Sequence, residues 1–290
     1  MIGRGVNRMR QERLEFTGRG GLRLVATARG EPDAPTVLLL HGGGQTRQSW
    51  GGTAERLAAS GRYAVALDMR GHGESAWCPE GRYRVADFAA DLALVLERLP
   101  RPPIVVGASL GGITSLLYAE AHDMERLHGI VLVDIAARIE VEGARRISEW
   151  MLAHPDGFES LEAVAEAIAA YTPHRKRKPD FESLKRVVRR YPDGRYRWHW
   201  DPRFMSKTGP AEVADSARLL RAAGTLRVPT LLVRGRESDV ISLDGVREFR
   251  DAVPHAEFVD VSGAGHMLAG DRNDAFTDAV QDFLERHDSV

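Results

Sequence analysis

A serine flanked by small residues is the feature of this sequence with the clearest chemical meaning. The segment Gly107-Ala108-Ser109-Leu110-Gly111 has the spacing G-x-S-x-G and lies between an apolar run, 104–106, and an apolar helical segment, 113–121. Between a strand and a helix, this pattern predicts a tight turn that exposes the serine hydroxyl at the N-terminus of the helix. Because a helix N-terminus favours a developing negative charge, we interpret Ser109 as a nucleophile.

A serine hydroxyl needs a base to become a useful nucleophile. His266 is the best placed of the ten histidines, because it follows the last apolar run, 258–261, and precedes the last helical segment. Loops at the carboxyl ends of parallel strands form the ligand-binding edge of an open α/β sheet. We therefore predict that His266 is the general base.

The base in turn needs a carboxylate that holds its ring in one tautomer. Asp239 follows the apolar run 231–233 and is the predicted acid. Glu237, two residues earlier, is a local alternative, and Asp134, directly after the apolar run 130–133, is a distant one. The preferred chain order is therefore nucleophile, acid, base.

Two backbone N–H groups are needed to stabilise a tetrahedral oxyanion. Leu110, the residue after the nucleophile, supplies one of them. The second is expected from the run His41-Gly42-Gly43-Gly44, where glycines let the backbone approach a substrate closely. Gly43 is the preferred donor and Gly44 the alternative, with Gly44 also expected to contact the substrate. His41 is interpreted as a structural histidine that hydrogen-bonds this loop.

Short apolar runs that alternate with helical periodicity must position these loops. Such runs, separated by amphipathic segments such as 85–99 and 274–284, indicate strands buried on both faces of a parallel sheet. The alternation stops between about residues 138 and 226, where the pattern is helical, charged and aromatic. We predict a core of residues 1–136 and 226–290 and a helical cap of residues 137–225. Trp198 and Trp200 are the cap residues expected to line the substrate pocket.

Composition narrows the classes of function. The 40 Lys and Arg residues balance 41 Asp and Glu residues, so there is no basic excess that would suggest a nucleic-acid partner. The one cysteine excludes an internal disulfide and a cysteine-based zinc site. No long apolar stretch predicts a membrane span, and the polar N-terminus does not resemble a secretory signal, so the expected compartment is the cytoplasm.

Together these motifs resemble the α/β-hydrolase superfamily, in its serine esterase-like branch, which is related to cofactor-free haloperoxidases, C–C bond hydrolases and epoxide hydrolases. The resemblance also includes the turn Asp68-Met69-Arg70-Gly71-His72-Gly73-Glu74-Ser75, which braces the active-site floor in such proteins. It implies an eight-stranded, mostly parallel sheet with helices on both faces and a cap inserted after the sixth strand. Epoxide hydrolases and haloalkane dehalogenases have Asp at the position of Ser109, so the serine favours acyl chemistry.

The predicted function is a carboxylesterase that cleaves a small or medium ester through an acyl-enzyme. A thioesterase, a lactonase, a C–C bond hydrolase or a perhydrolase would use the same triad. A receptor that binds a ligand on a hydrolase fold is the alternative from another class. No metal and no cofactor are expected, and the sequence leaves monomer and homodimer open. The basic run 174–178 is interpreted as a solvated loop, or as a site that attracts a carboxylate-bearing substrate or an acidic acyl carrier protein.

Overall fold

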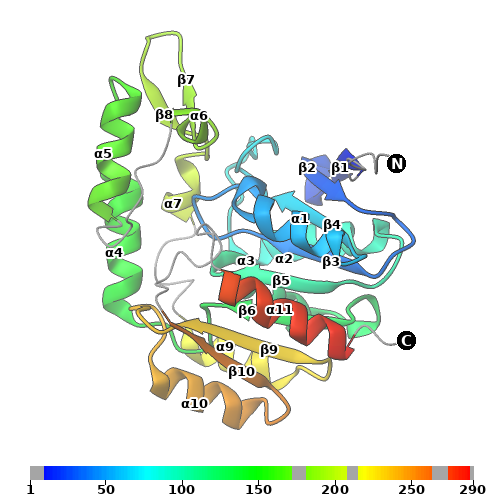
Figure 1. Cartoon of the computed structure of the whole chain (residues 1–290). Coiled ribbons are helices and arrows are strands. Elements are labelled where there is room, and N and C mark those ends of the chain that lie inside the picture. The colour runs from blue at the N-terminus through cyan, green and yellow to red at the C-terminus, as the bar shows by residue number, and fades with distance from the viewer. Residues whose placement is uncertain (1–9, 172–180, 208–214, 263–273, 288–290) are drawn as a thin grey trace, which may run out of the picture.

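One eight-stranded sheet forms the centre of the computed structural model, which describes residues 10–171, 181–207, 215–262 and 274–287. The strand order is β1-β2-β4-β3-β5-β6-β9-β10. The pairs β1–β2 and β2–β4 are antiparallel, and the other five pairs are parallel. The predicted fold, a mostly parallel sheet of eight strands, is therefore confirmed (Figure 1).

The central strands are short and apolar because helices cover both of their faces. Every residue of β3, β5 and β6 is buried. The strands of the sheet are β1 Gln11–Thr17, β2 Arg23–Arg29, β3 Thr36–Leu40, β4 Tyr63–Asp68, β5 Ile104–Ala108, β6 Gly129–Val133, β9 Thr230–Gly235 and β10 Glu257–Val261.

Two layers of helices enclose the sheet. Helices α1 and α11 cover one face, and α2, α3, α9 and α10 cover the other, which gives two separate apolar clusters (Figure 1). The bounds are α1 Gly51–Ala59, α2 Val85–Arg98, α3 Leu110–Ala121, α9 Ser216–Gly224, α10 Leu243–Ala252 and α11 Asp274–His287. Three short 3-10 helices, η1 Arg19–Gly21, η2 Arg47–Trp50 and η3 Met124–Arg126, lie in connecting loops.

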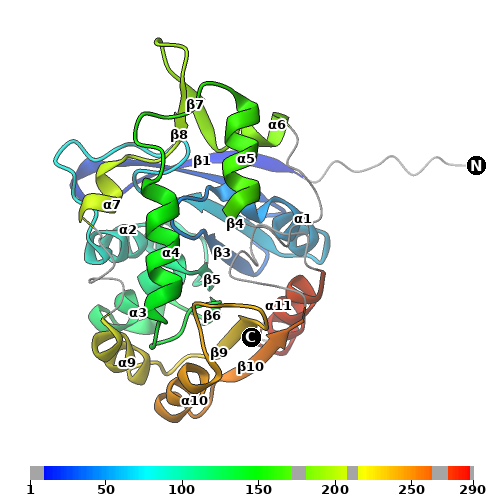
Figure 2. The same cartoon turned by 90° about the vertical axis from the view of Figure 1, so that its left-hand side faces the viewer.

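The chain between β6 and α9 builds a separate cover over the carboxyl ends of the strands (Figure 2). A Cβ on Gly143, in the first helix of this cover, would lie 2.3 Å from the carbonyl oxygen of Asp239, beyond the end of β9. Its elements are α4 Val141–Leu152, α5 Leu161–Tyr171, α6 Phe181–Leu184, β7 Val188–Arg190, β8 Tyr196–Trp198 and α7 Arg203–Lys207. We call residues 141–171 and 181–207 the cap.

The structure differs from the sequence predictions at three places. Strand β1 was not expected, and β7 and β8 form a small antiparallel sheet in a segment predicted to be helical. Helix α9 falls inside the range predicted for the cap, but it packs against α3 and α10 of the core, and Thr225, which follows it, donates its hydroxyl to the Ala119 carbonyl of α3. This helix therefore belongs to the core.

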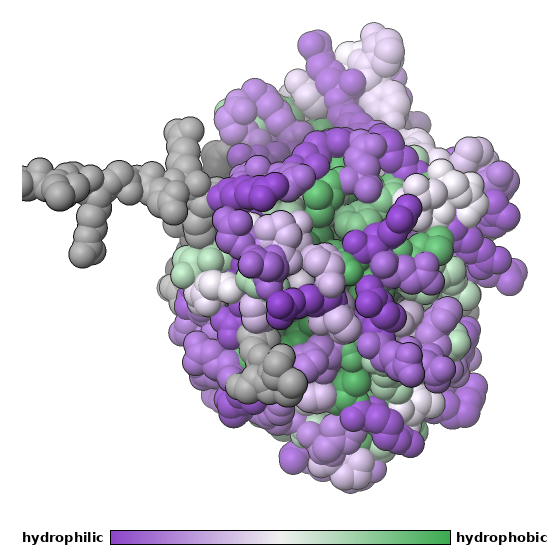
Figure 3. Space-filling model, turned by 90° about the vertical axis from the view of Figure 1, so that its right-hand side faces the viewer, coloured by the Kyte–Doolittle hydropathy of each residue, from purple (hydrophilic) through white to green (hydrophobic). Residues whose placement is uncertain are grey.

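The end of the molecule away from the cap has an ordinary polar surface. Hydrophilic side chains dominate that view, and hydrophobic ones show mainly in the recesses between them (Figure 3). Within the described ranges, no helix has both the length and the apolar character that crossing a membrane requires.

Candidate active site

Ser109 lies in a strained turn between β5 and α3. Its φ of 45° and ψ of −110° are unusual for a residue with a side chain. Among the described residues, only Asp134, with a φ of 48°, is another non-glycine with a positive φ. The N–H of Ser109 donates to the carbonyl of Val133, at 3.1 Å, so the turn is fastened to the neighbouring strand β6. The serine side chain remains partly accessible.

Glycines on both sides of Ser109 make this turn possible. A Cβ on Gly107 would lie 2.5 Å from the carbonyl carbon of Gly111, and a Cβ on Gly111 would lie 2.5 Å from the carbonyl oxygen of Leu40. A Cβ on Gly112 would lie 2.2 Å from the Cγ2 of Ile135. No side chain fits at these distances, so the steric reason for the G-x-S-x-G spacing is visible in the packing.

The loop after β3 lies against Ser109, since a Cβ on Gly42 would be 3.5 Å from the Cβ of Ser109. Two of its glycine N–H groups already have acceptors. Gly42 donates to Gln45 Oε1 at 2.9 Å, and Gly44 donates to His72 Nε2 at 3.1 Å. Within the part of the chain that the structure describes, the N–H groups of Gly43 and Leu110 have no such acceptor. Among the described residues, Gly44 thus has an N–H that is already bonded, which distinguishes it from Gly43.

His41 hydrogen-bonds this loop, as predicted from the sequence. The ring is fully buried, accepts a hydrogen bond from the N–H of Met69 at 3.0 Å and donates from Nδ1 to the carbonyl of Gly42 at 2.8 Å. Burial lowers the pKa of His41 to about 4, so the ring is neutral near pH 7. A neutral ring that already uses both nitrogens is a structural group, not a second base.

The two candidate acids have different surroundings. The carboxylate of Asp239 is 36% exposed and forms an ion pair with Arg146 of cap helix α4, with Nη2 and Oδ2 2.6 Å apart. Asp134 is 1% exposed and follows β6, the strand next to β5. Its carboxylate accepts hydrogen bonds from the N–H of Gly235 at 3.1 Å and from the hydroxyl of Ser238 at 2.6 Å. Glu237, the third candidate, is exposed.

The predicted base, His266, lies outside the described residues, and so does the basic run 174–178. The described part of the site consists of the turn at Ser109, the glycine loop 41–44 and the two aspartates.

The turn after β4 supports the glycine loop through buried charge. Asp68 is fully buried and pairs with Arg47, whose guanidinium also reaches Glu74. The hydroxyl of Ser75 donates to the Asp68 carbonyl at 2.5 Å and accepts from the N–H of Val25 at 2.9 Å. These contacts agree with the structural role that the resemblance implies for residues 68–75.

Cap side chains cover the glycine loop. A Cβ on Gly44 would lie 3.3 Å from the indole ring of Trp200 and 3.0 Å from Cε of Met151. The ring of Trp198 stacks on that of Trp200, with centroids 4.9 Å apart. Phe204 lies 3.5 Å from a Cβ built on Gly43. The sequence pointed to both tryptophans but missed Met151 and Phe204, because nothing in their spacing distinguishes them from cap core residues.

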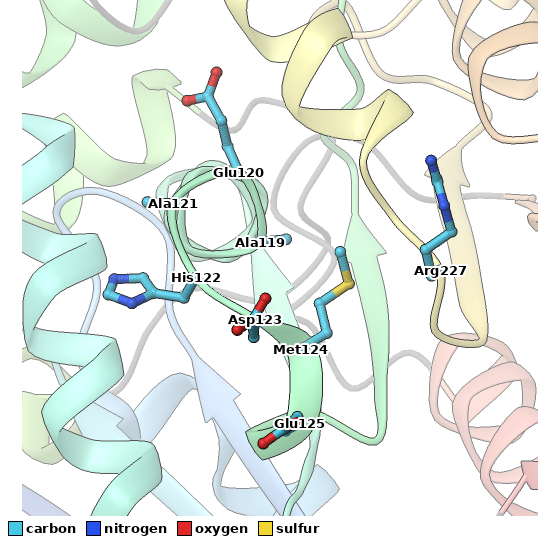
Figure 4. A pocket seen from close by; sticks show the side chains of 8 residues that line it. All are labelled: Ala119, Glu120, Ala121, His122, Asp123, Met124, Glu125 and Arg227. Atoms are coloured by element: carbon cyan, nitrogen blue, oxygen red, sulfur yellow. The ribbon is translucent and has the colours of Figure 1, made fainter.

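A polar cavity of about 740 Å³ at the other end of α3 is a different feature. It is lined by residues 119–125 and Arg227, whereas Ser109 precedes the first residue of α3. The side chains of Glu120, His122 and Asp123 do not converge on a common point there (Figure 4). Among the described residues no group of three His, Cys, Asp or Glu side chains is arranged to hold a metal ion.

Comparison with known proteins gives the same family for most of the chain. Residues 35–272 match the family model described as "alpha/beta hydrolase fold". Esterase Rv0045c of Mycobacterium tuberculosis is 31% identical over 273 residues, which cover 90% of this chain and 86% of that protein. A crystal structure of that esterase has a TM-score of 0.76 at 29% identity and covers 96% of this chain and 92% of its own.

Two further relatives align along nearly the full length. An α/β hydrolase of Novosphingobium aromaticivorans has a TM-score of 0.79 at 26% identity, covering 95% of this chain and 98% of its own. The 2-(acetamidomethylene)succinate hydrolase of Mesorhizobium japonicum is 27% identical over 91% of this chain and 92% of that enzyme. With its sheet order, nucleophile turn and glycine loop, the chain belongs to the α/β-hydrolase fold family.

Proposed function

We propose that the protein is a serine hydrolase that cleaves carboxylic esters through an acyl-enzyme. The observation that carries this proposal is the strained turn at Ser109, next to the N–H groups of Gly43 and Leu110, which have no acceptor among the residues that the structure describes. A backbone strain of this kind persists only where the surrounding structure enforces it, and it is typical of functional sites. The similarity to an esterase over most of the chain supports the same activity.

The reaction proceeds in two halves. In the first, Ser109 Oγ attacks the ester carbonyl, and His266 accepts the hydroxyl proton. The N–H groups of Gly43 and Leu110 stabilise the negative oxygen of the tetrahedral intermediate. His266 then returns the proton to the leaving alcohol. In the second half, water attacks the acyl-enzyme in the same way and releases the acid.

We assign the carboxylate of the triad to Asp134 rather than to Asp239, the acid predicted from its place after the apolar run 231–233. Asp134 is buried beside the nucleophile strand and held by two donors, so its orientation is fixed. Its positive φ makes it the counterpart of Ser109 on the adjacent strand. Asp239 is more exposed, and its carboxylate pairs with Arg146 of the cap.

Small and medium esters are the proposed substrates, because aromatic and thioether side chains of the cap lie directly over Gly43 and Gly44. The other reactions that the same triad supports are separated by a panel of esters, thioesters, lactones and C–C cleavage substrates. A receptor on this fold would bind its ligand without turnover. If the basic run 174–178 recruits anionic substrates, replacing it with serines raises KM for those substrates only.

The direct test is hydrolysis of p-nitrophenyl butyrate by the wild type and by Ser109→Ala. We expect measurable turnover in the wild type and its loss in the variant, because the alanine has no nucleophile. Comparable hydrolysis by the alanine variant would refute the proposal.

A further inference from the structure

Three buried histidines surround the glycine loop 41–44, and one of them comes from the cap. His41 and His72 belong to the core, and His199 follows strand β8 of the cap. The ring centroid of His72 lies 5.1 Å from that of His41 and 6.0 Å from that of His199. None of the three is more than 2% exposed.

Backbone contacts fix the tautomer of each ring. A ring nitrogen that accepts a hydrogen bond carries no proton, so the other nitrogen of a neutral ring is the donor. His199 accepts at Nδ1 from the N–H of Gly73, at 2.9 Å, and its Nε2 therefore donates to the carbonyl of Gly44, at 3.3 Å. His72 accepts from Gly44 and donates to the carbonyl of Arg70. Burial lowers the pKa of His199 well below its usual value, which agrees with a neutral ring.

The three rings hold three successive peptide groups. His41 holds the peptide 42–43 at its carbonyl, His72 holds the peptide 43–44 at its N–H, and His199 holds the peptide 44–45 at its carbonyl. A peptide group is planar and trans, so its N–H points away from its C=O. Because the Gly42 carbonyl is also bonded by the N–H of Gln45, the Gly43 N–H is directed to the opposite side of the loop.

We propose that His199 is a positioning residue of the oxyanion hole, through which the cap sets the orientation of the glycine loop. This role rests on the proposed function. The contact with Gly44 is important because glycine has a wide choice of backbone conformations, and Gly44 has a φ of 74°. Without the ring of His199, the Gly44 carbonyl loses this hydrogen bond, and the loop that carries the Gly43 N–H loses one of its three histidine anchors. The direction of the Gly43 N–H is then less narrowly fixed.

The bond from Gly73 gives His199 a second anchor. Gly73 lies in the turn after β4, and its neighbour Glu74 donates its N–H to Asp68 Oδ2 at 2.8 Å. The ring thus spans the two core loops that carry the active-site floor. The Phe204 ring packs edge-on against His72, with centroids 4.9 Å apart, and closes the same cluster from the cap side.

Three substitutions separate the two bonds of His199. His199→Phe removes both, His199→Gln can still donate to the carbonyl of Gly44, and His199→Asn can still accept from Gly73. His154→Phe is the matched control, since His154 is an exposed cap histidine whose ring rests on Phe158. Each variant is measured for kcat and KM with p-nitrophenyl butyrate and for inhibition by a trifluoromethyl ketone, which forms an oxyanion with the serine. Melting temperatures are recorded alongside.

We expect His199→Phe to lower kcat by about 10- to 100-fold, less than the loss of a whole oxyanion donor. KM should change little, and affinity for the trifluoromethyl ketone should fall in step with kcat. The glutamine variant should recover more kcat than the asparagine variant, and the control should match the wild type. The glutamine–asparagine comparison carries the test alone if the phenylalanine variant does not fold.

Unchanged kcat in the folded His199 variants, or a ranking with asparagine above glutamine, would overturn the positioning role. If Ser109→Ala is inactive in the same experiment, that result leaves the proposed function standing. Retained hydrolysis by Ser109→Ala would overturn the proposed function and, with it, this role.

Discussion

The turn after β5 and the loop after β3 carry the two proposed oxyanion donors, but different forces hold them. The β5 turn is set by sterics, because no Cβ fits at Gly107 or Gly111. The β3 loop has more open glycines and is held by hydrogen bonds with buried neutral histidines, two of which donate to the loop while His72 accepts from it. The first arrangement is insensitive to protonation, and the second depends on rings that must stay uncharged.

A second contrast concerns the acids at the carboxyl ends of β6 and β9. Asp134 shares the buried, strained backbone of Ser109, whereas Asp239 faces the cap on a half-exposed loop. The nucleophile and its acid would thus occupy equivalent turns of adjacent strands, whereas Asp239 pairs with Arg146 of the cap.

The largest expected effect distinguishes these two aspartates. Asp134→Asn should lower kcat/KM by about 10³- to 10⁴-fold, because a neutral amide no longer holds or stabilises the charged base. Asp239→Asn, its matched control, should cost less than about tenfold, since it removes only an exposed ion pair. Ester hydrolysis by both variants, with thermal melting to verify folding, measures the difference. The reverse ranking would return the role to Asp239.

The next effect tests whether sterics hold the β5 turn. Gly111→Ala should reduce hydrolysis by at least about 100-fold, because displacing the nucleophile by an ångström is enough for such a loss. The new Cβ would lie 2.5 Å from the Leu40 carbonyl oxygen, so stability should also fall by about 1–3 kcal/mol.

Gly52→Ala in helix α1 is the control for this substitution, because no atom lies within 4 Å of a Cβ there. It should retain activity and match or slightly exceed the wild type in stability. Equal activity of the two alanine variants would show that the turn tolerates a side chain and would contradict the steric account.

The smallest effect tests whether the β3 loop depends on neutral rings. The pKa of His41 is about 4 and that of His72 about 3 in the folded protein, against about 6.5 in an unfolded chain. Between pH 6.5 and 4 the unfolded state therefore binds protons that the folded state does not, and the free energy of unfolding falls as the pH falls. Each such histidine contributes about 1.4 kcal/mol per pH unit in that window.

Urea unfolding at successive pH values measures this slope. His199→Gln removes one titrating ring and should make the slope shallower by up to about 1.4 kcal/mol per pH unit. Identical slopes for the variant and the wild type would show that His199 titrates normally, which the buried neutral ring does not allow.

Much of this architecture could be predicted from the sequence, because buried parallel strands leave continuous apolar runs such as 130–133 and 231–233. Strand β1 was missed because it is an edge strand with mostly charged or exposed residues. Strands β7 and β8 have three residues each, too short to show a period of two. Whether such short or edge segments form strands depends on pairing with distant parts of the chain, which the local sequence pattern does not reveal.

The site divides in the same way. Ser109 and the glycine loop have local motifs, so their geometry could be anticipated. The contrast between Asp134 and Asp239 depends on burial and on donors that lie about a hundred residues away, such as Gly235 and Ser238. No sequence pattern indicated a role for His199, because its partners Gly44 and Gly73 belong to core loops far earlier in the chain.

The most direct test of the central claim is labelling by a fluorophosphonate probe, with the modified peptide identified by mass spectrometry. An activated serine in a strained turn, beside two free N–H donors, should react rapidly and stoichiometrically, and the adduct should map to Ser109. Absence of labelling in the folded protein, or an adduct on another residue with Ser109 unmodified, would contradict the account.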